Sequence, residues 1–123
     1  MKRDMDLIRK LLLYFEQKTD MELEYNTKIP GYDETTINYH LVLLAQAELI
    51  DYECARSPDN SSRLTIVKAV GLTWQGQEFL DTARNETIWK KTKSKISEVS
   101  GGLSLELLKS LLLFQAKQKL GID

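Results

Sequence analysis

Cysteine is almost absent from this sequence of 123 residues, in which Cys54 is the only one. An intrachain disulfide is therefore excluded, and reducing conditions suit the chain. Cys54 alternates with Ile50 and Tyr52 at the period of a strand. We therefore expect a buried strand thiol rather than a reactive one.

Long apolar runs are also missing, because no run exceeds five residues, as in Leu11–Phe15. A membrane span needs about 20 such residues, so we expect no segment that crosses a bilayer. The opening MKRDMDLIRK interleaves acids with bases and lacks an apolar stretch that ends in small residues, unlike a secretory signal. These features predict a cytoplasmic protein.

The residues that catalytic and cofactor sites require are scarce. His40 is the only histidine, and a metal site would need it to join carboxylates and Cys54 in a geometry that no spacing indicates. We expect a surface or capping histidine. No G-x-S-x-G motif is present, and the glycines form neither G-x-G-x-x-G nor a phosphate loop. We therefore expect no enzymatic activity, no cofactor and no metal.

What the sequence does contain is typical of one globular domain, with 42% hydrophobic and 28% charged residues. The net charge of −1 hides an uneven distribution. Residues 1–83 carry 9 Lys/Arg against 14 Asp/Glu, a net −5, whereas residues 84–119 carry 8 against 3, a net +5. If nucleic acid is the partner, the attraction for phosphates must come mainly from the C-terminal half or from a few hairpin residues.

Hydrophobic periodicity in the first 70 residues predicts both helices and strands. Apolar spacing predicts helices over residues 4–18 and 34–50, the second capped by Asp33. Alternation predicts a short edge strand at 21–25. Two further strands, 50–54 and 64–70, flank the turn-rich run RSPDNSSR and predict a hairpin.

The last 50 residues have a helical pattern. Thr73 is a candidate cap for a helix that buries Phe79 and Ala83, with a break expected near Asn85. After Gly101 and Gly102 a final helix is expected, with Ser104 as its cap and Gly121 beyond its end. We expect Trp74 and Trp89, at helical positions among apolar residues, to fill the core or an interface.

The order helix, short strand, helix, hairpin, helix predicts a mainly helical α+β fold of the winged helix-turn-helix type, with the hairpin as the wing and additional C-terminal helices. We expect residues 1–84 to form the winged-helix core. Residues 85–123 would form a helical extension that packs on the core or makes a dimer interface, within a single domain overall. The first helix of the DNA-contacting pair is expected to be vestigial, because residues 18–33 offer only the strand pattern and a Pro-Gly break.

Four segments together resemble domain-of-unknown-function family 2513, over nearly the whole chain: MKRDMDLIRKLLL, INYHLVLLAQAELI, LTWQGQEFLDTARNETIWKKTKSKI and GGLSLELLKSLL. The resemblance implies a winged-helix-like fold and a setting among phage-type accessory genes, with no catalytic residue or ligand to carry over. The chain departs from the usual Ala-Gly-Leu-Ile helix ending at Glu48, where glycine would adopt a left-handed conformation at lower cost. The turn there is expected to be distorted.

Candidate DNA contacts lie on the helix that precedes the hairpin and on the hairpin itself. No Lys or Arg occurs between Ile29 and Ala55, so that helix offers only uncharged hydrogen-bonding groups and a histidine at its exposed positions. Cations would come from the hairpin and the C-terminal half. The candidates are Thr35, Thr36, Asn38, Tyr39 and His40 of the helix and Arg56, Arg63 and Lys68 of the hairpin.

Two functional hypotheses remain open. One is a non-enzymatic regulator of phage or mobile-element type that acts through double-stranded DNA or a DNA-bound partner. The alternative is a protein-protein interaction adaptor on the same scaffold with no DNA affinity. The leucine-rich final helix, which is apolar around more of its circumference than one packing face requires, predicts a homodimer. The lysines of residues 90–95 fit a solvated helix face better than a dedicated site.

Overall fold

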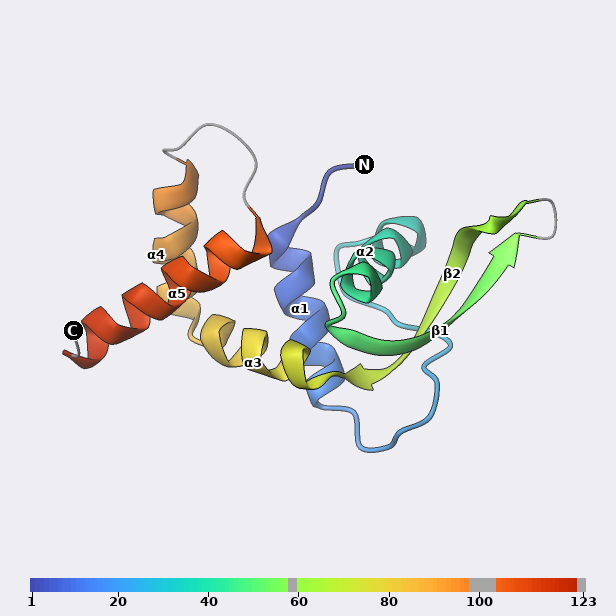
Figure 1. Cartoon of the computed structure of the whole chain (residues 1–123), viewed down its shortest axis with the longest axis horizontal. Helices are drawn as coiled ribbons and strands as arrows, with labels where there is room; N and C mark the ends of the chain where they lie inside the picture. The colour runs from blue at the N-terminus through green and yellow to red at the C-terminus, as the bar shows by residue number, and fades with distance from the viewer. Residues whose placement is uncertain (58–59, 98–103, 122–123) are drawn as a thin grey trace. The chain divides into compact units, whose positions relative to one another are not determined.

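The computed structural model describes residues 1–57, 60–97 and 104–121. For residues 55–57, 60–65, 96–97, 105 and 119 only the backbone is described. The described elements, in chain order, are α1 (Met5–Glu16), α2 (Glu34–Gln46), β1 (Ile50–Ser57), β2 (Asn60–Leu72), α3 (Trp74–Ala83), α4 (Glu86–Ser97) and α5 (Leu105–Leu120) (Figure 1). The predicted mainly helical α+β fold is confirmed. The chain divides into two compact units, Met1–Gln77 and Glu78–Asp123.

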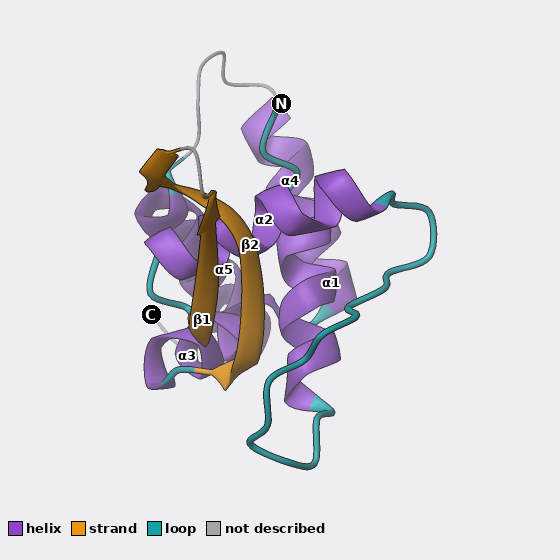
Figure 2. Cartoon of the chain, turned by 90° about the vertical axis from the view of Figure 1, so that its right-hand side faces the viewer, coloured by secondary structure: helices purple, strands orange, loops and turns teal. Residues whose placement is uncertain are grey.

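The hairpin is the only sheet among the described residues. Strands β1 and β2 pair antiparallel from Ile50 opposite Leu72 outward, as the sequence predicted, but they run further than expected (Figure 2). Bulges interrupt the register, the first between Asp51 and Tyr52. The hairpin extends well past α2 (Figure 1). The hydrogen bonds that join the hairpin backbone to α2 and to the preceding loop lie at Val67 and Ala69, in the second half of β2.

The prediction that Cys54 is buried is wrong, because the thiol is exposed. Ile50 at the start of β1 is 2% exposed, whereas Tyr52 is 40% exposed. The register shift after Asp51 leaves its extra residue, Val70, in β2 rather than in β1. Past Ile50 it is β2 that lies against α2, where the Val67 N–H bonds to Asn38. Alternation alone therefore misplaced the cysteine.

Helix α1 begins where the sequence supplies a cap. The carboxylate of Asp4 accepts hydrogen bonds from the backbone N–H groups of Asp6 and Leu7, which satisfies two of the donors that a helix start leaves unpaired. The helix buries one apolar stripe, formed by Leu7, Ile8, Leu11, Leu12 and Phe15. This stripe is the contribution of α1 to the core of the first unit.

Helix α2 is shorter than the predicted range of 34–50. It starts at the expected cap, where the Asp33 carboxylate accepts from the N–H of Thr36 at 2.7 Å. It ends at Gln46 because Glu48 adopts φ +62°, in the left-handed region, and the chain then enters β1 at Ile50. A left-handed conformation that glycine adopts at lower cost is thus present here with a glutamate side chain.

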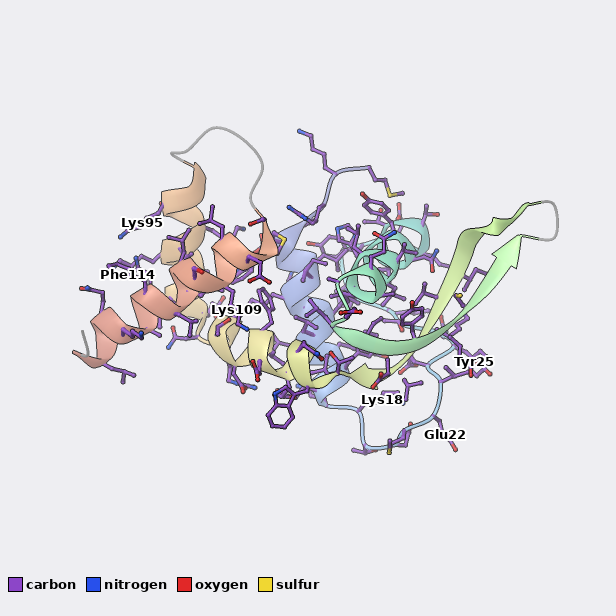
Figure 3. The ribbon with its side chains drawn as sticks, in the orientation of Figure 1. Lys18, Glu22, Tyr25, Lys95, Lys109 and Phe114 are labelled. Atoms are coloured by element: carbon purple, nitrogen blue, oxygen red, sulfur yellow. The ribbon has the colours of Figure 1, made fainter. Side chains whose placement is uncertain are left out.

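The segment between α1 and α2 is irregular, and no helix lies there. The predicted strand at 21–25 is wrong in extent, since only one antiparallel bridge forms, between Glu24 and Ala69 of β2. The Lys18 ammonium holds this loop by donating to the Asp20 carboxylate at 2.6 Å and to the carbonyl of Glu22 (Figure 3). Local hydrogen bonds of this kind satisfy polar groups of a loop whose backbone does not pair as a full strand.

The start of α3 sits close to the end of α2. Thr73, as predicted, caps α3 by accepting from the N–H of Gly76 at 2.9 Å, and its hydroxyl donates to the carbonyl of Glu48 at 2.7 Å. A Cβ at Gly76 would lie 2.0 Å from the carbonyl oxygen of Leu49. Glycine is therefore required here for backbone approach rather than for an unusual φ.

The second unit contains the helices α4 and α5, which pack on each other. The break near Asn85 is confirmed, with the Asn85 side chain accepting from the N–H of Ile88. The caps at Ser104 and Gly121 are also confirmed, and Gly121 is left-handed at φ +72°. Trp89 is buried as predicted. Trp74, at the first position of α3, is 78% exposed and does not fill the core, which leaves the interface alternative.

Candidate nucleic-acid interface

The outward face of α2 is defined by what the helix buries. Ile37, Leu41 and Leu44 pack inward. On a helix with 3.6 residues per turn, the opposite side is then occupied by a line of residues at i, i+4, i+7 and i+11. These are Thr35, Tyr39, Val42 and Gln46, of which Thr35 and Gln46 are exposed and the other two are partly exposed. This line contains no charged side chain.

One edge of that face lies against the hairpin. The Asn38 side-chain oxygen accepts from the backbone N–H of Val67 in β2 at 3.1 Å. Asn38, predicted as a DNA contact, therefore helps to hold β2 against α2. Beside it, Lys68 of β2 donates to the carbonyl of Tyr25 at 2.9 Å and lies over the Tyr25 ring, 5.6 Å from its centroid. Figure 3 shows Tyr25 where the loop approaches the hairpin.

The other edge is closed by His40, which the sequence placed among the exposed residues. That placement is wrong, because His40 is 1% exposed. Its Nε2 accepts the backbone N–H of Asp4 at 2.8 Å, so Nδ1 carries the hydrogen and donates to the carbonyl of Thr36 at 2.8 Å. Both ring nitrogens are used within the fold. The capping role that the sequence suggested is the closer description.

Tyr39 connects the outward face to the first residues of the chain. Its hydroxyl donates to the carbonyl of Met1 at 3.3 Å, and its ring meets the His40 ring edge-on. The Asp4 carboxylate also accepts from the Tyr32 hydroxyl at 3.1 Å. Burial, followed by this hydrogen bond to Asp4, raises the pKa of Tyr32. Residues 1–4 are thereby fixed beside α2.

The remaining predicted contacts fall into two groups. Thr36 is partly buried, and its backbone N–H and carbonyl bind Asp33 and His40. Arg56 lies in β1 and Arg63 in β2, but their side chains lie outside the described residues. The structure thus brings Thr35, Tyr39, Asn38 and Lys68 together around one face of α2.

Two features of this region gave no sequence signal. The first is the position of Lys2 and Arg3, both exposed, next to α2. The second is a groove of about 320 Å³ between the loop, α2 and β2. The Thr27 hydroxyl oxygen is buried and has no hydrogen-bond partner among the described residues. Both features depend on contacts between segments far apart in the sequence, which periodicity cannot predict.

Negative and positive side chains lie in different places around α2. Glu34 is exposed in its first turn and Glu48 follows its end, while the helix contributes no cation. Cations instead flank the face, with Lys2 and Arg3 on the His40 side and Lys68 on the β2 side. Such an arrangement places hydrogen-bonding groups in the middle of the outward face of α2 and positive charge at both edges of that face.

The described residues contain no group of three or more His, Cys, Asp or Glu side chains that could hold a metal ion. None of the helices in the described part of the chain combines the length and the hydropathy that a bilayer span requires.

Comparison with known proteins identifies relatives but no biochemical activity. An uncharacterized protein of Haemophilus influenzae is 37% identical over 118 residues, which cover 90% of this chain and 92% of the relative. No solved structure matches the chain with statistical significance. The model of the family described as Hypothetical protein (DUF2513) matches residues 2–104. The chain therefore belongs to the DUF2513 family, as the sequence resemblance indicated.

Proposed function

We propose that the protein is a non-enzymatic winged-helix regulator of the phage or mobile-element type that acts on double-stranded DNA, directly or beside a DNA-bound partner. Helix α2 would enter the major groove, and the β1–β2 hairpin would be the wing against adjacent phosphates. Thr35 and Tyr39 would face the bases, while Lys68, Arg56 and Arg63 would lie toward the backbone.

The order of elements supports the winged-helix assignment. Helix α2 leads directly into the hairpin through the turn at Glu48, and Glu24 adds a one-residue third strand beside β2. The helix that normally precedes the recognition helix is replaced by the loop that contains Pro30 and Gly31. A reduced winged helix of this kind keeps the two elements that contact DNA.

The observation that carries the proposal is the outward face of α2, uncharged along its length and flanked by cations. Base edges are read by hydrogen-bonding side chains, whereas phosphates are bound by Lys and Arg. The line from Thr35 to Gln46 offers hydrogen-bonding side chains, and the edges of the face offer cations. Because the helix has no arginine, we expect modest sequence selectivity.

Titration of the full chain with duplex DNA tests the proposal. We expect binding at low salt that weakens steeply as salt rises, since phosphate contacts release counterions. Thr35→Glu, which places a carboxylate on the outward face, should reduce affinity by about tenfold or more, because a like charge faces the phosphates. Thr87→Glu is the matched control, as Thr87 is also exposed and also follows a glutamate at the start of a helix. Equal affinity of the two variants, or no binding at low salt, would contradict the proposal.

An adaptor without DNA affinity is the second candidate, and two exposed apolar features favour it. Trp74 is 78% exposed, and α5 exposes Leu113, Phe114 and Leu120 at 43%, 53% and 72%. Exposed aromatic and leucine side chains of this kind frequently form protein interfaces. A second copy of the chain is the partner that fits both hypotheses, because paired wings match paired DNA half-sites. Absence of DNA binding at low salt would favour the adaptor.

A further inference from the structure

We infer that the free edge of strand β1 binds an extended, lysine-rich segment of a partner protein, which adds to the hairpin as a third strand. The edge belongs to the first unit and begins at the C-terminal end of α2. The inference does not depend on DNA binding. It gives the protein a surface for a partner of defined chemistry.

Strand β1 is paired on one side only. In the described part of the chain the sheet has two strands, and the isolated bridge joins Glu24 to β2 rather than to β1 (Figure 2). The residues from Asp51 to Cys54 are all exposed. A strand with a free side presents a row of backbone N–H and C=O groups to which another extended chain can pair. Such pairing takes its affinity from backbone hydrogen bonds and its specificity from alternate side chains.

The register of the hairpin identifies which backbone groups point to the free edge. In an antiparallel pair, opposed residues alternate between those that bond to each other and those that do not. The N–H of Val67 bonds to Asn38, and the carbonyl of Ala69 accepts from the preceding loop at 2.7 Å, so both residues direct backbone groups away from β1. Their partners across the hairpin are Cys54 and Tyr52. The N–H and C=O groups of Cys54 and Tyr52 therefore point outward, where a third strand would meet them.

A groove of about 550 Å³ lies beside this edge. It is lined by the first three residues of β1, by the end of α2 with the turn that follows, and by Thr73 and Gln75 at the start of α3. No residue of β2 lines it, so the groove lies on the side of β1 that has no neighbouring strand. An added strand needs this room, because its backbone lies about 4.8 Å from β1 and its side chains extend to both faces.

The groove and the edge are acidic. Glu48 and Asp51 line the groove, and Glu53 lies on the same face of β1 as Asp51, since residues two apart in a strand share a face. All three side chains are exposed, and no lysine or arginine lines the groove. Lys68 is opposite Glu53 in the register, but its ammonium donates to the carbonyl of Tyr25. Lysines at alternate positions of an added strand would form favourable cross-strand pairs with these acids.

The same acids disfavour a second copy of the chain on this edge. If Tyr52 paired antiparallel with Tyr52 of a second copy, Asp51 would face Glu53, and if Tyr52 paired with Cys54, Glu53 would face Glu53. Like charges that are directly opposite each other destabilise a strand pair. A basic strand has no such conflict. Its intervening residues would lie on the other face, beside Tyr52, which is 40% exposed.

The test begins with a short synthetic peptide of alternating valine and lysine, labelled at one end and titrated with the full chain at low salt. Fluorescence anisotropy measures the affinity. A peptide of alternating valine and glutamate has the same backbone and should bind about tenfold more weakly or not at all, because its charges repel those of β1. Absence of binding by the valine-lysine peptide, or equal affinity of the two peptides, would overturn the inference.

Methylation of the peptide backbone tests strand addition itself. In an antiparallel third strand the valines lie opposite Tyr52 and Cys54 with their N–H groups toward β1, whereas the N–H groups of the lysines point away. N-methylation of the valines should lower affinity by about tenfold or more, because it removes donors of the new ladder. N-methylation of the lysines is the matched control and should have a much smaller effect. Equal effects would overturn the strand geometry.

Two protein variants locate the site. Asp51→Asn/Glu53→Gln removes both charges of the edge with little change of shape, and it should weaken binding of the valine-lysine peptide by about threefold to tenfold. Glu22→Gln/Glu34→Gln removes two exposed acids from elsewhere in the first unit and should bind the peptide like the wild type. Equal losses in the two variants would show a general charge effect and overturn the assignment to β1.

The thiol of Cys54 reports on the edge directly, since it is exposed and is the only thiol in the chain. A bound third strand places a side chain next to it, so saturating valine-lysine peptide should slow its reaction with a thiol reagent severalfold. An unchanged rate at saturation would place the peptide elsewhere. Protection that rises with protein concentration in the absence of peptide would assign the edge to a second copy of the chain instead. Each of these two results would overturn the inference and leave the proposed DNA contacts untouched.

Discussion

At the scale of single residues, the tightest constraint in the first unit is at Gly76. Thr73 brings the start of α3 to the end of α2 by two hydrogen bonds, and the two backbones meet at Gly76 and Leu49. A side chain cannot be added there without moving backbone, since a Cβ would lie 2.0 Å from the Leu49 carbonyl oxygen. The position is thus closed to every residue except glycine.

We expect Gly76→Ala to lower the free energy of unfolding by about 1–3 kcal/mol or more, the usual cost of overpacking a site that cannot relax. Urea denaturation of the full chain measures the change. Gly71→Ala in β2 is the control, because nothing lies within 4 Å of its added Cβ. A variant Gly76→Ala as stable as Gly71→Ala would show that the α3 start is not held against Leu49.

Glu48 shows how far residue chemistry alone could predict the fold. Glu48 occupies the position of the glycine in the Ala-Gly-Leu-Ile helix ending, and its φ is +62°. The backbone conformation was therefore predictable from the position, although the residue disfavours it by about 1–2 kcal/mol. The hydrogen bond from Thr73 to the Glu48 carbonyl helps to hold this turn, and no sequence pattern showed that pairing.

At the scale of elements, the prediction was right where hydrophobic periodicity is regular. Helices α1 and α3 and the hairpin were found because their apolar residues repeat at 3.6 or 2. The strand at 21–25 was not realised, because alternation of Met21, Leu23 and Tyr25 does not show whether a partner strand lies alongside. Only Glu24 reaches β2.

The end of α2 was misjudged for a related reason. Apolar spacing continues smoothly through Leu49 and Ile50, and it does not distinguish a helix from the strand that follows. The transition is decided by the left-handed turn at Glu48 and by the pairing of Ile50 with Leu72. Both depend on contacts made after the helix has ended.

The first turn of α2 carries a prediction about pH. Hydrogen bonds from the Thr36 hydroxyl and backbone N–H lower the pKa of the Asp33 carboxyl. A depressed pKa in the folded state means that the cap stabilises fully above the unfolded pKa of about 3.9 and that this contribution is lost as pH falls through the folded value. Asp33→Asn keeps a capping oxygen but does not titrate.

We therefore expect the stability of the wild type, relative to Asp33→Asn, to fall as the pH is lowered below about 4. Unfolding free energies measured at neutral and acidic pH give the difference, and the other acids cancel because both proteins contain them. Thr36→Val removes the hydroxyl donor and should reduce the pH-dependent difference. Parallel pH profiles for the wild type and Asp33→Asn would contradict the role of this cap.

At the scale of the whole molecule, the candidate site was predicted in part. The sequence analysis chose the helix on which the proposal rests, and Thr35 and Tyr39 do lie on its outward side. It wrongly predicted that His40 is exposed, because the ring binds the N–H of Asp4, 36 residues earlier. The position of Lys2 and Arg3 beside α2 was missed for the same reason. Contacts between distant segments decide which side chains remain available to a partner.

The surface of α5 is an apolar feature to which the DNA contacts proposed above give no role. Leu108 and Leu112 are buried, but Leu107 and Phe114 lie one heptad apart on one flank, and Leu113 and Leu120 do so on the other. Exposed leucine and phenylalanine in such lines favour association with another helix. The proposed second copy would bury both lines.

We accordingly expect light scattering to give the mass of a dimer for the wild type and a shift toward monomer for Phe114→Glu, because a carboxylate in an apolar interface is costly to desolvate. Thr87→Glu is the matched control. It introduces the same carboxylate at an exposed position of α4, outside the two apolar lines of α5, so it should keep the wild-type mass. A monomeric wild type at high concentration would exclude the second copy as the partner of α5. A dimer unaffected by Phe114→Glu would place the interface elsewhere.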